Sequence, residues 1–173
     1  MPKIIPELKE RFISAAKRRL SESNDVTIRQ VAQDCETAVG TVYNYFPSKE
    51  ALLAEVMMED WLICGEHMRS DAMNAANPLD AVRATTMALR GFTAKYAALW
   101  RNYAGARDSM ETLNSRHHLI IKEIALAAAQ TIEHFDVSGD AYLPEVLAEL
   151  ILYASRTDDG FERIANALEK ILK

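Results

Sequence analysis

The chain has 173 residues, of which 49% are hydrophobic, and its formal net charge is −5. This length and apolar content suit one large domain or a small domain fused to a larger one, and they exclude a disordered chain. No apolar run reaches the roughly eighteen residues that a membrane-spanning helix needs, so we expect a soluble, cytoplasmic protein with no membrane partner.

The acidic excess lies in the second part of the chain. Residues 1–55 hold eight Lys and Arg against eight Asp and Glu, whereas residues 56–173 hold twelve against seventeen. Because the first part is neutral, any affinity for nucleic acid there must come from locally placed cations and helix N-termini.

Helix signals dominate the sequence, and long alternating β-branched runs are missing, so the predicted fold class is all-α. The first helix is expected at about 5–21. A second begins at Thr27, whose spacing to Gln30 is typical of a capping box. A third, at about 38–45, ends before Pro47, and Ser48 then caps the next helix.

Five further helices are expected in the rest of the chain. One runs from Ser48 to about Asn74, another opens at Pro78 and ends near Gly105, and a third lies between residue 108 and about residue 135. The last two are expected at about 141–157 and 160–172. We place a DNA-binding domain at residues 1–50 and a ligand-binding and dimerisation domain at residues 51–173.

The second and third helices are short and closely joined, and the next begins with a lysine, which is the layout of a helix-turn-helix. The run Gly40-Thr-Val-Tyr43-Asn-Tyr-Phe46-Pro-Ser-Lys49-Glu-Ala-Leu-Leu53, with Thr27 and Val31-Ala32 before it, resembles the N-terminal domain of TetR/AcrR-type transcriptional regulators. The resemblance covers about residues 5–55. It implies an N-terminal three-helix DNA-binding domain, called the reading head below, which a long helix joins to a helical ligand-binding and dimerisation domain.

The side chains expected to contact DNA are hydroxyl, amide and cationic groups on and around the third helix. They are Thr27, Arg29, Val39, Gly40, Thr41, Tyr43, Asn44, Tyr45 and Lys49. Asn44 is the best candidate for a base contact, because a side-chain amide pairs bidentately with adenine. Lys49 is a cation in the first turn of a helix, where a bound phosphate would offset the unfavourable macrodipole.

Some of these residues also have a structural interpretation. Gly40 lets the backbone approach the groove, and close packing against the second helix is a structural reason for the same glycine; both can hold. Arg29 is as readily a solvated surface charge as a phosphate contact. In the turn, Cys35-Glu36 replaces the family's usual Ala-Gly pair, so Glu36 is expected to take a left-handed conformation and to place a negative charge near DNA.

A small, largely apolar ligand is expected in the second domain, among bulky side chains on three successive helices. Ordinary core packing is the alternative for most of them. The candidates are Trp61, Cys64, Met68, Met87, Phe92, Tyr96, Trp100, Tyr103, Met110 and His117. Tyr96 and His117 rank highest, because each adds a polar group to an otherwise apolar face.

The last two predicted helices carry more apolar surface than one core contact needs. Leu143, Val146, Leu147 and Leu150, with Phe161, Ile164 and Leu168, therefore predict a four-helix interface between two copies of the chain. A helix buried inside a monomer is the alternative.

The predicted function is a ligand-responsive regulator, more often a repressor in this family, that binds a near-palindromic double-stranded DNA operator as a homodimer. A dimeric small-molecule-binding protein that has lost DNA binding is the second hypothesis. No catalytic motif is present, the histidines show no HxxxH or HExxH spacing, and the two cysteines show no CxxC spacing. We therefore expect no enzymatic activity, no cofactor and no metal.

Overall fold

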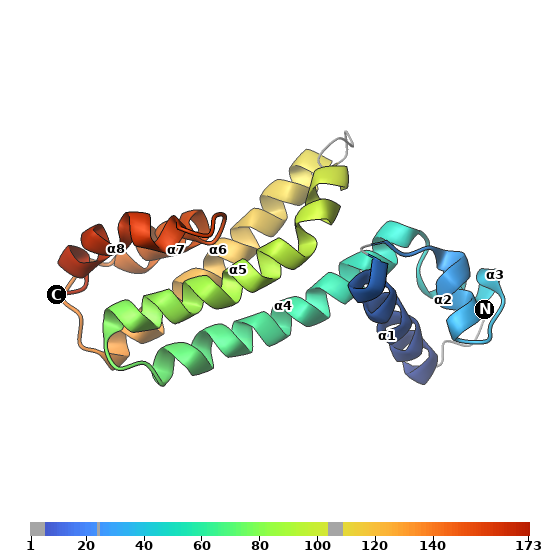
Figure 1. Cartoon of the computed structure of the whole chain (residues 1–173), viewed down its shortest axis with the longest axis horizontal. Coiled ribbons are helices and arrows are strands. Elements are labelled where there is room, and N and C mark those ends of the chain that lie inside the picture. Colours follow the sequence, from blue (N-terminus) through green and yellow to red (C-terminus); the bar gives the residue numbers. More distant parts are fainter. Residues whose placement is uncertain (1–5, 24, 104–108) are drawn as a thin grey trace. The chain divides into compact units, whose positions relative to one another are not determined.

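The computed structural model describes residues 6–23, 25–103 and 109–173, and the side chains of Pro6 and of residues 98–119 lie outside the described set. The described residues form eight helices and no strand (Figure 1), which confirms the all-α prediction. The helices are α1 (Pro6–Ser23), α2 (Ile28–Asp34), α3 (Val39–Tyr45), α4 (Lys49–Met73), α5 (Pro78–Tyr103), α6 (Ser109–His134), α7 (Leu143–Ala154) and α8 (Gly160–Ile171). The predicted order is confirmed, and the helix ends differ from the expected positions by no more than a few residues.

The chain divides into two compact units, Met1–Asp60 and Trp61–Lys173. The division falls within α4, further along the chain than the expected domain boundary at residue 50. The first turns of α4 therefore complete the small N-terminal unit, and the rest of this helix belongs to the larger unit.

The first unit is built around Phe12 of α1, whose side chain is fully buried. Its ring makes edge contacts with Tyr45 and Phe46, at centroid distances of 5.5 and 6.5 Å. Val42 of α3 and Leu52 of α4 are also completely buried. Because each helix contributes an apolar face to one core, α3 is held in place by packing, although it has only seven residues.

The second unit packs α6 against α5 and α7, and α8 against α5 and α7 (Figure 1). Its core includes Leu89, Ile124, Leu147 and Leu168, none of which is exposed. The turn into α8 depends on Gly160, since a Cβ at this position would stand 2.1 Å from the carbonyl oxygen of Ala154. Among the described residues, no helix is long and apolar enough to cross a membrane.

Candidate nucleic-acid interface

The start of α2 is fixed by the predicted capping box. The Thr27 hydroxyl oxygen accepts a hydrogen bond from the Gln30 backbone N–H at 3.2 Å, and the Gln30 side chain accepts one from the Thr27 backbone N–H at 2.8 Å. The Thr27 hydroxyl also donates to the Gln30 side-chain oxygen at 2.8 Å. A phosphate contact from this hydroxyl would therefore compete with a bond inside the protein.

The turn between α2 and α3 is a Schellman motif. The backbone N–H of Thr37 donates to Ala32, at 2.9 Å, and that of Glu36 donates to Gln33, at 3.1 Å. Glu36 has a φ of 54°, which confirms the expected left-handed conformation at the position where glycine is commonest. Its exposed carboxylate lies two residues before the N-cap of α3.

The outer surface of α3 presents Val39, Gly40, Tyr43 and Asn44, all of which are exposed. Val42 faces the core, and Thr41 is half-buried. Tyr45 was expected in the same exposed row, but it is half-buried because its ring packs on Phe12.

Gly40 has open space around it. Nothing lies within 4 Å of the position where a Cβ would stand, and no glycine among the described residues has a positive φ. The alternative of close packing against α2 is therefore wrong for this residue. Within the chain itself, neither packing nor backbone conformation requires a glycine at this position.

Lys49, the first residue of α4, forms an ion pair with Asp25 in the loop before α2. The Lys49 Nζ lies 2.7 Å from the Asp25 Oδ1. Asp25 was not among the predicted site residues, because sequence spacing alone does not bring residue 25 near residue 49. Its side chain is 71% exposed and that of Lys49 is 34% exposed, so the pair faces solvent.

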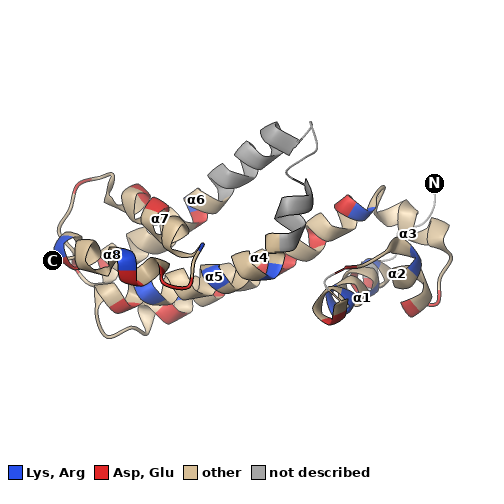
Figure 2. Cartoon of the chain, turned by 45° about the horizontal axis from the view of Figure 1, so that its top comes forward, with Lys and Arg blue, Asp and Glu red and all other residues tan. Residues whose placement is uncertain are grey.

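Most cations of the first unit are bonded to acidic or carbonyl oxygens. Lys9 pairs with Glu55, Lys17 with Glu59 and Asp60, and Arg18 and Arg19 with Asp34; Arg11 donates to the Cys35 carbonyl at 3.0 Å. Figure 2 shows Lys and Arg interspersed with Asp and Glu on α1. Among the described cations of this unit, Arg29 alone has no such bond. Most cations of the first unit are therefore already neutralised or bonded within the protein.

Several predicted ligand residues meet in the second unit. The Trp61 and Phe92 rings contact edge to face at a centroid distance of 5.2 Å, and Phe92 lies 5.0 Å from Tyr96. Tyr96 and Met68 are almost completely buried, Cys64 is 7% exposed, and Met87 lies at the surface. The side chains of Trp100, Tyr103, Met110 and His117 lie outside the described residues.

Cys35 and Cys64 form no disulfide, and both are buried. Burial raises the pKa of the Cys64 thiol to about 11 and also raises that of Cys35, so both remain protonated near neutral pH. The described residues contain no group of His, Cys, Asp and Glu that could hold a metal ion.

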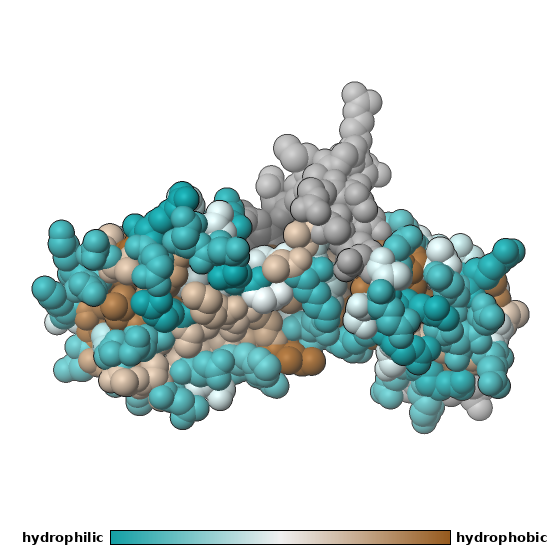
Figure 3. Space-filling model, in the orientation of Figure 1, coloured by the Kyte–Doolittle hydropathy of each residue, from teal (hydrophilic) through white to brown (hydrophobic). Residues whose placement is uncertain are grey.

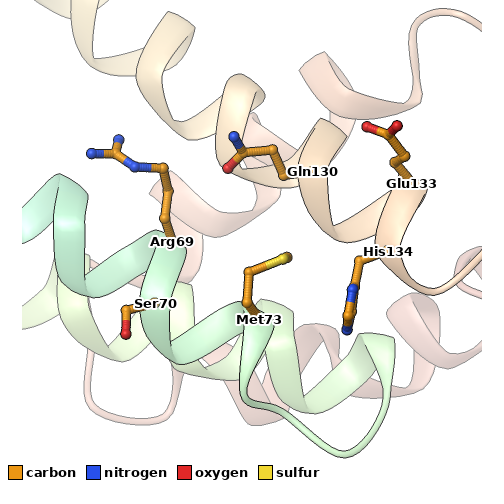
Figure 4. Close-up of a pocket in the computed structure, with 6 residues that line it drawn as sticks. All are labelled: Arg69, Ser70, Met73, Gln130, Glu133 and His134. Atoms are coloured by element: carbon orange, nitrogen blue, oxygen red, sulfur yellow. The ribbon is translucent and has the colours of Figure 1, made fainter.

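A groove of about 550 Å³ lies between α4 and α6 (Figure 4), and Trp61, Phe92 and Tyr96 do not line it. Six residues line it: Arg69, Ser70, Met73, Gln130, Glu133 and His134. They are mostly polar, and none was predicted as a ligand residue. The i, i+4 spacing from Arg69 to Met73 and from Gln130 to His134 marks one face on each helix, but the sequence does not reveal that these two faces meet.

The predicted dimer residues divide into two groups. Leu143, Leu147, Phe161 and Leu168 lie in the core of the second unit, and Phe161 is covered by the Arg83 guanidinium at 4.2 Å from the ring centroid. Val146 is 49% exposed, and Leu150 and Ile164 are half-buried. Tyr142 and Tyr153 are exposed as well, and apolar surface is visible on this unit in Figure 3.

Residues 13–56 match the model of the family described as bacterial regulatory proteins, tetR family. The fold is similar to that of a transcriptional regulator from Cytophaga hutchinsonii ATCC 33406, with 14% identity, 94% of this chain and 93% of that chain covered, and a TM-score of 0.66. It is also similar to GusR from Salmonella enterica, with 19% identity, 99% and 98% covered, and a TM-score of 0.65. No curated protein sequence matches the chain.

Proposed function

We propose that this chain, which belongs to the TetR family of bacterial regulatory proteins and carries that family's DNA-binding domain at residues 13–56, is a ligand-responsive repressor. It binds a near-palindromic double-stranded operator in the cytoplasm as a homodimer. The observation that carries the DNA-binding part is the exposed surface of α3, where Tyr43 and Asn44 stand beside the open Gly40. No catalytic step is assigned to the chain.

The proposed DNA contacts divide into two kinds. Asn44, Thr41 and Val39 read base edges, because amide and hydroxyl groups match the major-groove pattern and an apolar side chain matches the thymine methyl group. Tyr43, Tyr45, Arg29, Thr27 and Lys49 hold phosphates and set the register of α3 in the groove.

The proposed ligand is small and largely apolar, and it binds beside the aromatic cluster of Trp61, Phe92 and Tyr96, with Cys64 and Met68. The four predicted residues beyond the described side chains, Trp100, Tyr103, Met110 and His117, complete the proposed site. Because α4 carries both Lys49 and the residues from Trp61 to Met68, a ligand-induced shift of this helix would change DNA binding.

The DNA-binding proposal is tested by Tyr43→Ala and Lys49→Ala in a gel-shift titration. Each change should weaken binding roughly tenfold, since a lost contact costs on the order of 1–3 kcal/mol. Lys49→Ala should also make the salt dependence of binding less steep. Tyr142→Ala, which removes an exposed tyrosine from the second unit, is the matched control and should bind as the original chain does.

Thermal unfolding monitored by circular dichroism shows whether each variant keeps its fold. Unaltered DNA affinity in both variants would contradict the assignment of this surface.

The alternative function, a dimeric small-molecule-binding protein without DNA binding, is favoured by the pairing of cations in the first unit. Titration with a random-sequence duplex at several salt concentrations separates the two. A functional reading head has non-specific, salt-dependent affinity, whereas the alternative predicts none.

A further inference from the structure

The ion pair between Lys49 and Asp25 occupies the cation that the proposed function assigns to a DNA phosphate. The Nζ to Oδ1 distance of 2.7 Å is that of a direct, charge-assisted hydrogen bond. The Lys49 ammonium has other N–H donors, but a carboxylate this close neutralises its charge, so a phosphate gains the full attraction of the cation only when Lys49 leaves Asp25. Both partners are accessible to solvent, so the exchange requires little desolvation.

The Asp25 carboxylate is held in place independently of Lys49. Its Oδ1 also accepts a hydrogen bond from the Val26 backbone N–H at 2.8 Å, and its carbonyl oxygen accepts one from the Ser23 hydroxyl at 2.8 Å. Asp25 would keep its position after Lys49 had turned to another partner. The Lys49 ammonium and the Val26 N–H lower the pKa of this carboxyl, so it is negatively charged at neutral pH.

We propose that Asp25 is an affinity-determining residue that competes with DNA phosphate for Lys49, so that docking exchanges an internal ion pair for an intermolecular one. The inference rests on the proposed DNA-binding function. It gives Asp25 a direct role at the interface, although its side chain is acidic.

The exchange has a specific electrostatic consequence. When Lys49 neutralises a phosphate, a condensed counterion leaves the DNA. The carboxylate that Lys49 leaves is then unpaired and attracts cations from solution, which offsets part of this release. Binding by the original chain should therefore depend less steeply on salt than binding by a chain in which residue 25 is neutral.

The Lys49–Asp25 pair differs from other ion pairs of the first unit in the elements that it connects. Asp34 joins α1 to α2, and its side chain is only 9% exposed. Lys17 joins α1 to α4. The Lys49 pair links a loop residue to the first residue of α4, directly after the Pro47-Ser48 segment that follows α3.

A double-mutant cycle on the full-length chain tests the inference. The four proteins are the original chain, Asp25→Asn, Lys49→Ala and the double variant, each titrated with a random-sequence duplex at several salt concentrations. Glu50→Gln is the matched control, because Glu50 is an exposed carboxylate in the same helical turn. Circular dichroism melting shows that each variant is folded.

Asp25→Asn should raise the affinity roughly fivefold, the size expected for an exposed ion pair, and should make the salt dependence of binding somewhat steeper. The gain should largely vanish when Lys49 is alanine, and Glu50→Gln should give a smaller gain. A gain of equal size in both backgrounds would overturn the inference, because Asp25 would then act only through its long-range charge. A loss of affinity in Asp25→Asn would also overturn it, because Asp25 would then be positioning Lys49.

Binding by the original chain with no effect of Asp25→Asn would refute the competition while leaving the proposed function intact. Absence of DNA binding in all four proteins at low salt would refute both.

Discussion

At the scale of single residues, neither the packing nor the backbone conformation of the chain requires a glycine at position 40. A Cβ at this position would contact nothing within 4 Å, and the backbone does not adopt a positive φ. In a helix, glycine is less favourable than alanine because it loses more conformational freedom on folding. The cost is explained if a partner must approach the backbone of α3 closely.

Gly40→Ala should therefore raise the stability of the chain but lower its affinity for DNA. The variant is expected to be more stable by about 0.5 kcal/mol, because Gly40 lies in the first turn of α3 and the helix-interior value is about 1 kcal/mol. Its DNA affinity should fall several-fold, as measured by gel shift. Gly160→Ala provides the contrast: it should lower the melting temperature, because the new Cβ would clash with the Ala154 carbonyl. Unchanged DNA affinity in Gly40→Ala would contradict the close approach.

At the scale of helices, α1 and α2 are joined by a shared carboxylate. Asp34 of α2 accepts hydrogen bonds from Arg19 at 2.5 and 2.8 Å and from Arg18 at 2.9 Å. Hydrogen bonding from Arg19, supported by Arg18, lowers the pKa of Asp34 to about 2. Since the native state holds this carboxylate ionised, the bridge stabilises the reading head as long as Asp34 is deprotonated.

Asp34→Asn should destabilise the first unit in a pH-dependent way. A carboxyl whose pKa is lowered by folding contributes stability above its unfolded pKa of about 4, and this contribution is lost as the pH falls through its folded pKa of about 2. The difference in urea midpoint between the original chain and the variant should be constant above about pH 5 and should narrow below about pH 4. Amide hydrogen exchange should locate the effect in α1 and α2. Asp71→Asn, on exposed α4 surface, should show no such difference, and a gap that persists at low pH would argue against the ionic contribution.

The helices and their caps were predictable from the sequence because those signals are local. The spacing of Thr27 and Gln30 predicted the capping box, and Glu36 was placed correctly in the left-handed conformation. Contacts between distant residues were not predictable in the same way. The bond from Lys49 to Asp25 spans 24 residues and that from Arg83 to Glu162 spans 79, and each depends on how the helices pack. The same reason explains why the groove between α4 and α6 was missed.

At the scale of the whole molecule, the apolar surface of α7 is larger than the core of one subunit uses. Leu147 and Ile151 face that core, whereas Val146 and Tyr153 are about half exposed. Leu150 is half-buried between these two faces. Since Leu143, Leu147, Phe161 and Leu168 are committed to the subunit, the proposed dimer contact is narrowed to Val146, Leu150, Tyr153 and Ile164. Two α7–α8 pairs meeting through this face would form a four-helix contact with the self-complementarity that a twofold dimer requires.

Val146→Glu should therefore dissociate the proposed dimer. A carboxylate buried at an apolar contact without a partner costs on the order of 3 kcal/mol, which corresponds to a roughly hundredfold weaker association. Sedimentation equilibrium should give the original chain twice its 19.4 kDa mass and should give the variant a mass near that of one chain at the same concentration. Leu62→Glu introduces the same charge at a more exposed apolar position on α4 and should leave the dimer intact. Dissociation by Leu62→Glu but not by Val146→Glu would place the contact elsewhere, and a monomeric original chain would refute the proposed dimer.

Because a twofold operator engages two reading heads, the dissociated variant should also lose its preference for two half-sites over one.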